Sequence, residues 1–246
     1  MDCLLTVHVL LSRAGAAQTQ SECDKMQTMS CHSHGKRLLA LALSLSAAVL
    51  AALAQTNSTT PNERQQFLGK LVAAVIERTN HSVKYAYTYV HIDYPGGDVP
   101  ADTGVCSDEI IRAYRAVGVD LQKEVHEDIV KNWSAYPAKT KWRQAHPDPN
   151  IDHRRVPNLM VFFTRKGESL PITLGARDYA PGDIVTWDLG GDVPHIGMAV
   201  NVKSTGSGRP LMVHNIGQGP KMEDVLFSWK ITGHYRYFGP PSQEAH

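Results

Sequence analysis

Apolar residues in the first half of the chain recur at every third or fourth position, which is the period of amphipathic helices. The first such stretch follows Thr60, Pro61 and Glu63, which supply a helix cap, a first-turn proline and a capping box. Gly118 is a natural stop for the second stretch. The predicted helices cover residues 60–79, 106–117 and part of 121–133.

The segments around these helices are predicted to be extended chain and loop. Residues 83–90, "VKYAYTYV", are predicted to be extended. Residues 93–104, "DYPGGDVPADTG", form a loop rich in glycine, proline and aspartate. Residues 137–158 are predicted to be a long ordered loop, because Trp142 and Ile151 lie among their prolines and charges.

From residue 159 onward the apolar period changes to two, which is typical of strands, and turns rich in glycine and proline separate the apolar stretches. Helices followed by a meander of strands predict an α+β domain, in which N-terminal helices pack on an antiparallel sheet of about five or six strands. The candidate strands are residues 159–165, 183–189, 195–200, 211–216 and 233–238.

The N-terminal part of the chain has the features of an export signal. Residues 36–54 join a basic start to a short apolar run and a small-residue cleavage site. The run is too short for a membrane span, so we expect a periplasmic or secreted protein with no stable membrane insertion after cleavage. Met29 suits the start of such a signal; the alternative is an unusually long basic region. We expect residues 1–28 to be an upstream-start artefact, 29–54 a signal peptide, 55–62 a linker and 63–240 a single domain.

Charge and cysteine content narrow the possible functions. After residue 54 the basic and acidic residues are equal in number and form no basic tract, so nothing favours nucleic-acid binding. Cys3, Cys23 and Cys31 precede the expected cleavage point, which leaves Cys106 without an intramolecular disulfide partner. A single exported cysteine is paired between chains, is a free reactive thiol, or is an inert buried residue.

Cys106 stands at the predicted start of a helix. The free N–H groups and the partial positive charge of a helix start favour a thiolate over a thiol, and they can stabilise an oxyanion. The thiolate is the nucleophilic form of cysteine. Cys106 is therefore a candidate nucleophile for acyl transfer.

Such a nucleophile needs a base, and His195 is the candidate. Alternation along the predicted strand puts His195, Gly197 and Ala199 on one face, where the small neighbours leave space for a side chain from a packed helix. On the next strand, His214 or the oppositely facing Asn215 could orient the imidazole as the third member of a triad. The alternative is that each of these residues is structural.

Metal-binding spacings are absent from the sequence. Neither HExxH nor a paired Cys-x-x-Cys occurs, so the predicted chemistry uses no metal and no organic cofactor. His126, Asp128 and the cluster at residues 150–155 are polar groups that could line a cleft; the alternative is a solvated surface with loop salt bridges.

Seven stretches together resemble one family of exported bacterial proteins, the YijF-like group known as domain of unknown function 1287. The resemblance covers roughly residues 63–238. That family is in turn similar to the NlpC-type branch of the papain-like cysteine peptidase superfamily. The stretches are "TGVCSDEIIRAYRAVGVDLQ", "VHED", "PDPNIDHRRVPNL", "PGDIVTWDL", "HIGMAV", "VHNIGQG" and "GHYRY".

The resemblance implies a papain-like fold in which the catalytic residues follow the chain order Cys106, His195, His214. It also implies hydrolysis of an amide bond through a thioester, commonly in the stem peptides of peptidoglycan. The superfamily motif Asp-Cys-Ser-Gly is Val-Cys-Ser-Asp here, and the superfamily's substrate-facing tyrosine upstream of the cysteine would correspond to Tyr94.

The sequence therefore predicts an exported cysteine hydrolase acting on peptidoglycan or another envelope amide. The alternatives are a non-catalytic module on the same fold that binds the cell wall or a partner protein, and an acyl- or peptidyl-transferase. The catalytic candidates are Cys106, His195 and His214, and the candidates for substrate binding are Tyr94, Asp108, His153, Arg154 and Asn215.

Overall fold

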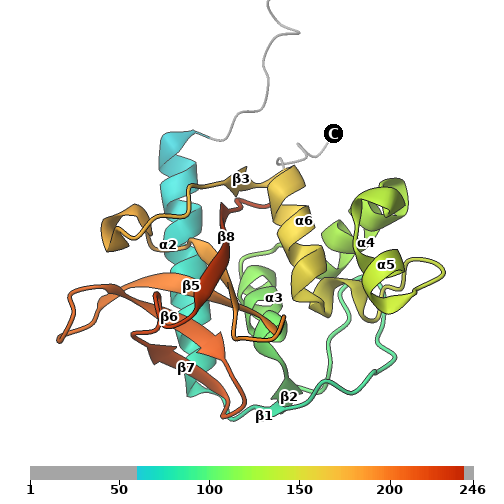
Figure 1. Cartoon of the computed structure of the whole chain (residues 1–246), viewed down its shortest axis with the longest axis horizontal. Coiled ribbons are helices and arrows are strands. Elements are labelled where there is room, and N and C mark those ends of the chain that lie inside the picture. The colour runs from blue at the N-terminus through green and yellow to red at the C-terminus, as the bar shows by residue number, and fades with distance from the viewer. Residues whose placement is uncertain (1–59, 241–246) are drawn as a thin grey trace, which may run out of the picture. The chain divides into compact units, whose positions relative to one another are not determined.

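The structure, a computed structural model, describes residues 60–240 of the 246-residue chain as an antiparallel sheet with helices packed against it (Figure 1). The α+β class predicted from the sequence is confirmed. The expected upstream start and signal peptide, with most of the linker, lie outside the described residues. In the described part of the chain, no helix combines the length and apolar character needed to cross a bilayer.

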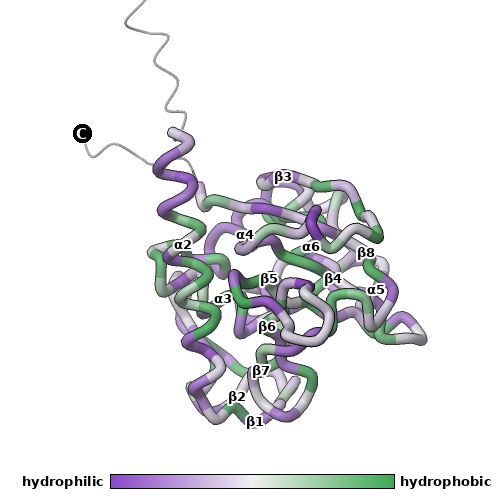
Figure 2. The backbone as a smooth tube through the Cα atoms, turned by 90° about the vertical axis from the view of Figure 1, so that its left-hand side faces the viewer, coloured by the Kyte–Doolittle hydropathy of each residue, from purple (hydrophilic) through white to green (hydrophobic). Residues whose placement is uncertain are grey.

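The predicted helices form where their start signals lie. The first is α2 (Pro61–Glu77), which carries the full capping box between Thr60 and Glu63 and is followed by a 3₁₀ turn. Hydrophilic and hydrophobic stretches alternate along it (Figure 2), as expected for a helix that buries one side. The next two are α3 (Cys106–Ala116) and α4 (Leu121–Lys131).

One predicted strand is wrong. Residues 159–165 lie within a helix, α6 (Val156–Lys166), which has a proline in its first turn. Its buried residues Leu159, Phe162 and Phe163 follow helical spacing. An apolar run of this length fits a buried strand or a buried helix equally well. The proline in the first turn is the signal that indicates a helix. The preceding stretch, predicted to be a loop, also contains a short helix, α5 (Ala138–Trp142).

Six strands form the sheet in the order β3-β8-β4-β5-β6-β7. The sequence predicted four of them, β4, β5, β6 and β8, and missed the short edge strands β3 and β7. A separate parallel pair joins β1 (Lys84–Tyr85) to β2 (Thr103–Gly104), directly before α3. The strands of the sheet are β3 (Glu168–Ser169), β4 (Ile184–Asp188), β5 (Pro194–Lys203), β6 (Pro210–Asn215), β7 (Pro220–Glu223) and β8 (Lys230–Arg236).

The two faces of β5 pack against different partners. Ile196, Met198 and Val200 join the main core, to which α2, α3 and α6 contribute. Ala199 faces a smaller cluster that includes Trp187 and lies on the other side of the sheet. The space beside Gly197, which the sequence analysis assigned to a packed helix, is filled instead by the Trp187 ring and by His214.

Replacing Gly197 with alanine is expected to destabilise the fold by about 1–3 kcal/mol, the usual range for overpacking. The added Cβ would lie 2.8 Å from the Val213 carbonyl oxygen and 3.1 Å from the His214 Cβ. Urea denaturation measures the effect. The matched control is Gly69→Ala in α2, where nothing lies within 4 Å, and where alanine should stabilise by about 0.5–1 kcal/mol. Equal effects at the two sites would contradict the packing described here.

Candidate functional site

Cys106 is the first residue of α3, and its side chain is buried. The chain enters the helix from the extended residue Val105, whose N–H donates to the Asp108 carboxylate over 2.7 Å. The backbone N–H of Asp108 donates in return to the Val105 carbonyl over 3.1 Å, and the two bonds fix the helix start. Cys106 is therefore held at the end of α3 where free N–H groups converge.

Three donors surround the sulfur. The backbone N–H groups of Ile196 and Ser107 and the hydroxyl of Tyr85 lie close enough to it to lower the pKa of the thiol. The Ile196 N–H belongs to the peptide that links Ile196 to His195, so the sulfur lies against the backbone of the candidate base. The backbone N–H of Cys106 also lies near the Tyr85 hydroxyl.

Burial raises the pKa of the Cys106 thiol to about 11, and the nearby Asp108 carboxylate raises it further. The Ile196, Tyr85 and Ser107 donors act in the opposite direction but do not outweigh burial. The stabilised thiolate predicted from the helix start alone is wrong here, because the side chain of Cys106 is buried. Removal of a charge from water is the larger effect.

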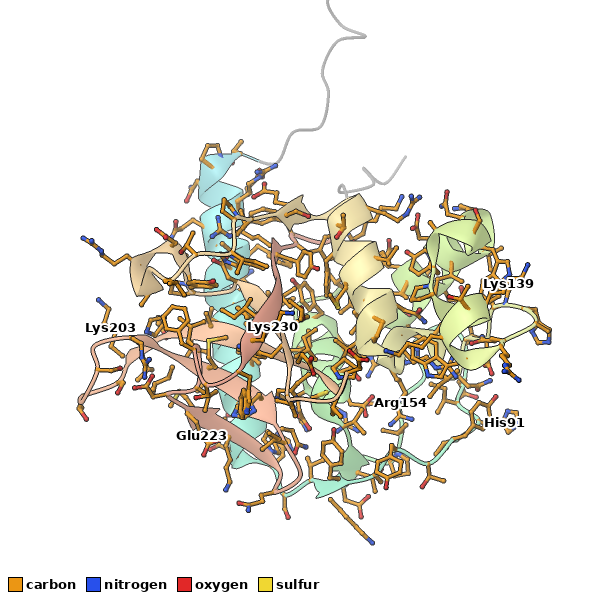
Figure 3. The ribbon with its side chains drawn as sticks, viewed as in Figure 1. His91, Lys139, Arg154, Lys203, Glu223 and Lys230 are labelled. Atoms are coloured by element: carbon orange, nitrogen blue, oxygen red, sulfur yellow. The ribbon has the colours of Figure 1, made fainter. Side chains whose placement is uncertain are left out.

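The two histidines predicted on neighbouring strands meet in the structure. Nε2 of His195 on β5 lies 2.9 Å from Nδ1 of His214 on β6, and both side chains are buried. The other ring nitrogen of His214 lies 3.0 Å from the carboxylate of Glu223. Figure 3 labels Glu223, which lies on β7. His214, and not Asn215, is thus the residue that contacts His195.

Glu223 sets the positions of the protons along this chain of contacts. A carboxylate only accepts hydrogen bonds, so Nε2 of His214 carries the hydrogen and its Nδ1 is an acceptor. Nε2 of His195 must then be the donor, which leaves Nδ1 of His195 with a free lone pair. We call Glu223, His214 and His195 the proton-ordering chain.

Both histidines are neutral near pH 7. Burial lowers the pKa of His195 to about 3, and the positive charge of protonated His214 would lower it further. Burial also lowers the pKa of His214, against the opposing effect of Glu223. The rings pack edge-on against Trp229, which excludes water from the pair.

Tyr94, the predicted substrate-facing tyrosine, lies edge-on to His126 with ring centroids 5.1 Å apart and is partly exposed. The tyrosine that contacts Cys106 is Tyr85, which the sequence analysis missed. Tyr85 could have been found only from strand pairing, because it lies in β1, which pairs with β2 just before the cysteine.

Asp108 and Arg154 form a buried salt bridge with two hydrogen bonds of 2.9 Å each. Arg154 also donates to the carbonyl groups of Ala86 and Thr88, over 3.4 Å in each case. The pair therefore ties the start of α3 to the segment that follows β1. The predicted contact of Asp108 and Arg154 with substrate stays a prediction.

The last two candidates are also buried. Burial and the positive charges of Arg154 and Arg115 lower the pKa of His153 to about 3. Asn215 accepts a hydrogen bond of 3.1 Å from the N–H of Gly217. Within residues 60–240, Nδ1 of His153 and Nδ2 of Asn215 have no hydrogen-bond partner.

Metal-ligating side chains do not cluster here. Over the described range, 60–240, no group of three or more His, Cys, Asp or Glu residues is placed to hold a metal ion. The described side chains at the site supply a thiol, an imidazole with a free lone pair, and several N–H and O–H donors.

Two comparisons with known proteins bear on this site. A family model described as "Domain of unknown function (DUF1287)" matches residues 72–237, which include every residue of the site. The chain is also 53% identical over 154 residues to the Escherichia coli (strain K12) protein named "Uncharacterized protein YijF". That match covers 63% of this chain and 74% of the relative.

The thiol of Cys106 is expected to react slowly with iodoacetamide at pH 7.5, because little of it is ionised. With a pKa of about 11, the folded chain should react on the order of 100-fold more slowly than the denatured chain, whose thiol has a pKa of about 8.5. A chain that starts at Gln55 contains no other cysteine, so mass spectrometry reads this thiol alone. A folded-state rate that levels off near pH 8 would contradict the assignment.

The fold should lose stability as the pH falls below about 6.5, the pKa of an unfolded histidine. His195 and His153 bind protons in the unfolded chain from that pH, but in the folded chain only near their pKa of about 3. Their contribution to stability is therefore present above pH 6.5 and is lost toward pH 3, at about 2 kcal/mol per histidine between pH 7.5 and 5. In urea denaturation at both pH values, His153→Gln should reduce this pH-dependent loss by about 2 kcal/mol; an unchanged loss would contradict the argument.

Proposed function

We propose, from the premise that this chain belongs to the DUF1287 family, that it is an exported cysteine hydrolase. Its domain would have the papain-like, NlpC-type fold, and it would cleave an amide bond through a thioester on Cys106. The proposed substrate is the stem peptide of peptidoglycan. Export rests on the signal-like sequence at residues 29–54.

The observation that carries this proposal is the order of protons in the proton-ordering chain. Glu223 and His214 leave the lone pair of His195 on Nδ1. A catalytic imidazole needs one nitrogen free for the reacting proton and the other held by an orienting group. An ordinary core histidine would not need a second histidine and a carboxylate aligned behind it.

The position of the sulfur supports the same proposal. The Ile196 N–H near the sulfur directly follows His195 in the chain, so the sulfur lies beside the backbone of β5, while the His195 ring packs against Trp187, Trp229 and His214. Because the thiol and the imidazole are both neutral at rest, proton transfer would accompany attack rather than precede it. Nδ1 of His195 would take the thiol proton while the sulfur bonds to the carbonyl carbon.

The remaining steps use groups that already surround the sulfur. The N–H of Cys106 and the hydroxyl of Tyr85 are donors that could stabilise the oxyanion. The tetrahedral intermediate would collapse to a thioester as His195 returns its proton to the leaving nitrogen. Water, deprotonated by the same Nδ1, would then release the carboxylic acid and restore the thiol.

The arrangement of elements also supports the papain-like comparison. A cysteine at a helix start packs on an antiparallel sheet, with a histidine from β5 and a third polar residue from β6. The chain order Cys106, His195, His214 is the order that the superfamily comparison requires.

Cys106→Ala and His195→Ala should each lower hydrolysis of purified wall fragments by at least about 1,000-fold, because each removes a group that acts on the reacting bond. Mass spectrometry of the products identifies the bond cleaved. If both variants stay folded and still release the wild-type products, the protein is not this hydrolase. Products that carry an added amine would indicate a transferase using the same thioester.

His214 offers a graded test of the orienting role. His214→Gln keeps a carbonyl that can accept from Nε2 of His195, whereas His214→Leu removes the acceptor. We expect the leucine variant to lose at least about 100-fold in kcat, and the glutamine variant to retain clearly more activity. Equal losses in two folded variants would show that His214 only fills space.

A further inference from the structure

Exposed aromatic side chains are concentrated on the segment that leaves the candidate nucleophile. Tyr87 is 81% exposed, Tyr89 48% and Tyr94 42%. These three lie within eight consecutive residues, directly after Tyr85, whose hydroxyl contacts Cys106. Isolated exposed apolar residues are ordinary on a protein surface, whereas a local concentration of large ones indicates a binding site.

The aromatic positions alternate along this segment. Tyr85, Tyr87, Tyr89 and His91 occupy every second position; the Tyr85 hydroxyl lies near the buried Cys106, whereas Tyr87 and Tyr89 are exposed. We call these four residues the aromatic row. Figures 1 and 3 show the chain leaving β1 and running along the rim of the molecule to His91.

The backbone under the aromatic row is fixed by a buried residue. Arg154 is held by Asp108 and donates to the carbonyl groups of Ala86 and Thr88. These two residues alternate with the tyrosines, so the contacts tie the backbone of the row to Arg154. The row is therefore presented on an anchored segment.

Tyr89 is the most firmly positioned exposed ring of the row. Its hydroxyl donates to Asp148 and accepts from the side-chain amide of Asn150, both over 3.0 Å. His91 packs edge-on against the ring, with centroids 5.3 Å apart. Polar groups thus hold the edge of the ring and leave about half of the side chain exposed to solvent, which lowers the entropic cost of binding a ligand.

The charge of the segment restricts the kind of ligand. From Tyr85 to Pro95 there is no lysine or arginine, and Asp93 is the only acidic residue. A nucleic acid or another polyanion would require cations here. Aromatic faces next to carboxylate and amide acceptors suit a neutral ligand that has both apolar C–H faces and hydroxyl donors.

We propose that the aromatic row binds a neutral glycan strand, with pyranose rings stacked on Tyr87 and Tyr89. The inference deepens the proposed function and rests on it for one point, that a glycan bound along the row would carry its attached peptide toward Cys106. The row would then bind the polymer, while Cys106 and His195 would act on the peptide.

Binding can be measured apart from catalysis by isothermal titration of a hexamer of N-acetylglucosamine into the Cys106→Ser protein. We expect saturable binding that weakens at least about tenfold when Tyr87 and Tyr89 are both replaced by alanine. Tyr89→Phe, which keeps the ring, should weaken binding less than Tyr89→Ala. The matched control is Leu174→Ala, since Leu174 is 93% exposed and lies outside the row; it should bind as the parent does.

The outcomes separate this inference from the proposed hydrolase. Glycan binding that depends on the row supports the inference even if no amide bond is cleaved. The inference is overturned if the hexamer does not bind, or if it binds equally to the folded double variant, even where wild-type protein hydrolyses wall peptides. Row-dependent binding of a free stem peptide without binding of the hexamer would also overturn it.

Discussion

The hydrogen bond between His195 and His214 is the contact on which the candidate site depends. Glu223 accepts a hydrogen bond from Nε2 of His214 and so determines which ring nitrogen of each histidine carries the proton. Three adjacent strands supply the three residues, and pairing of Gly197 with His214 sets their alignment. A shift of one residue in the pairing of β5 with β6, or of β6 with β7, would turn one of these three side chains to the opposite face of the sheet. The register of β5, β6 and β7 is therefore a condition for the chemistry.

Burial determines how this site can work. The same desolvation raises the pKa of the Cys106 thiol and lowers that of the His195 imidazole. A preformed thiolate–imidazolium pair is thus disfavoured in the closed structure, although donors surround the sulfur. A substrate carbonyl would change this balance under the proposed mechanism, because attack coupled to proton transfer would place the negative charge on an oxygen and not on the buried sulfur. Reactivity would then appear when substrate is bound, which would protect the Cys106 thiol from unwanted reactions.

Local signals predicted much of the structure, and long-range contacts account for what was missed. The capping box predicted α2, and period-two patterns predicted the strands that carry His195 and His214. Glu223 was missed because its strand is four residues long and its sequence is typical of a turn. Tyr85 was missed because loop spacing does not show which tyrosine folds back onto the cysteine. The direction of the thiol pKa shift required knowledge of burial, which no local pattern contains.

The buried pair of Asp108 and Arg154 links the chemistry to the surface beside it. Asp108 caps the helix that begins with Cys106, and Arg154 holds the carbonyl groups between the tyrosines. Removing one partner would leave an uncompensated buried charge, at a typical cost of about 3–5 kcal/mol. Arg154 therefore connects the segment with the exposed tyrosines to the start of the helix that carries the nucleophile. A ligand bound on that segment would be held at a fixed distance from the sulfur, because one ion pair positions both.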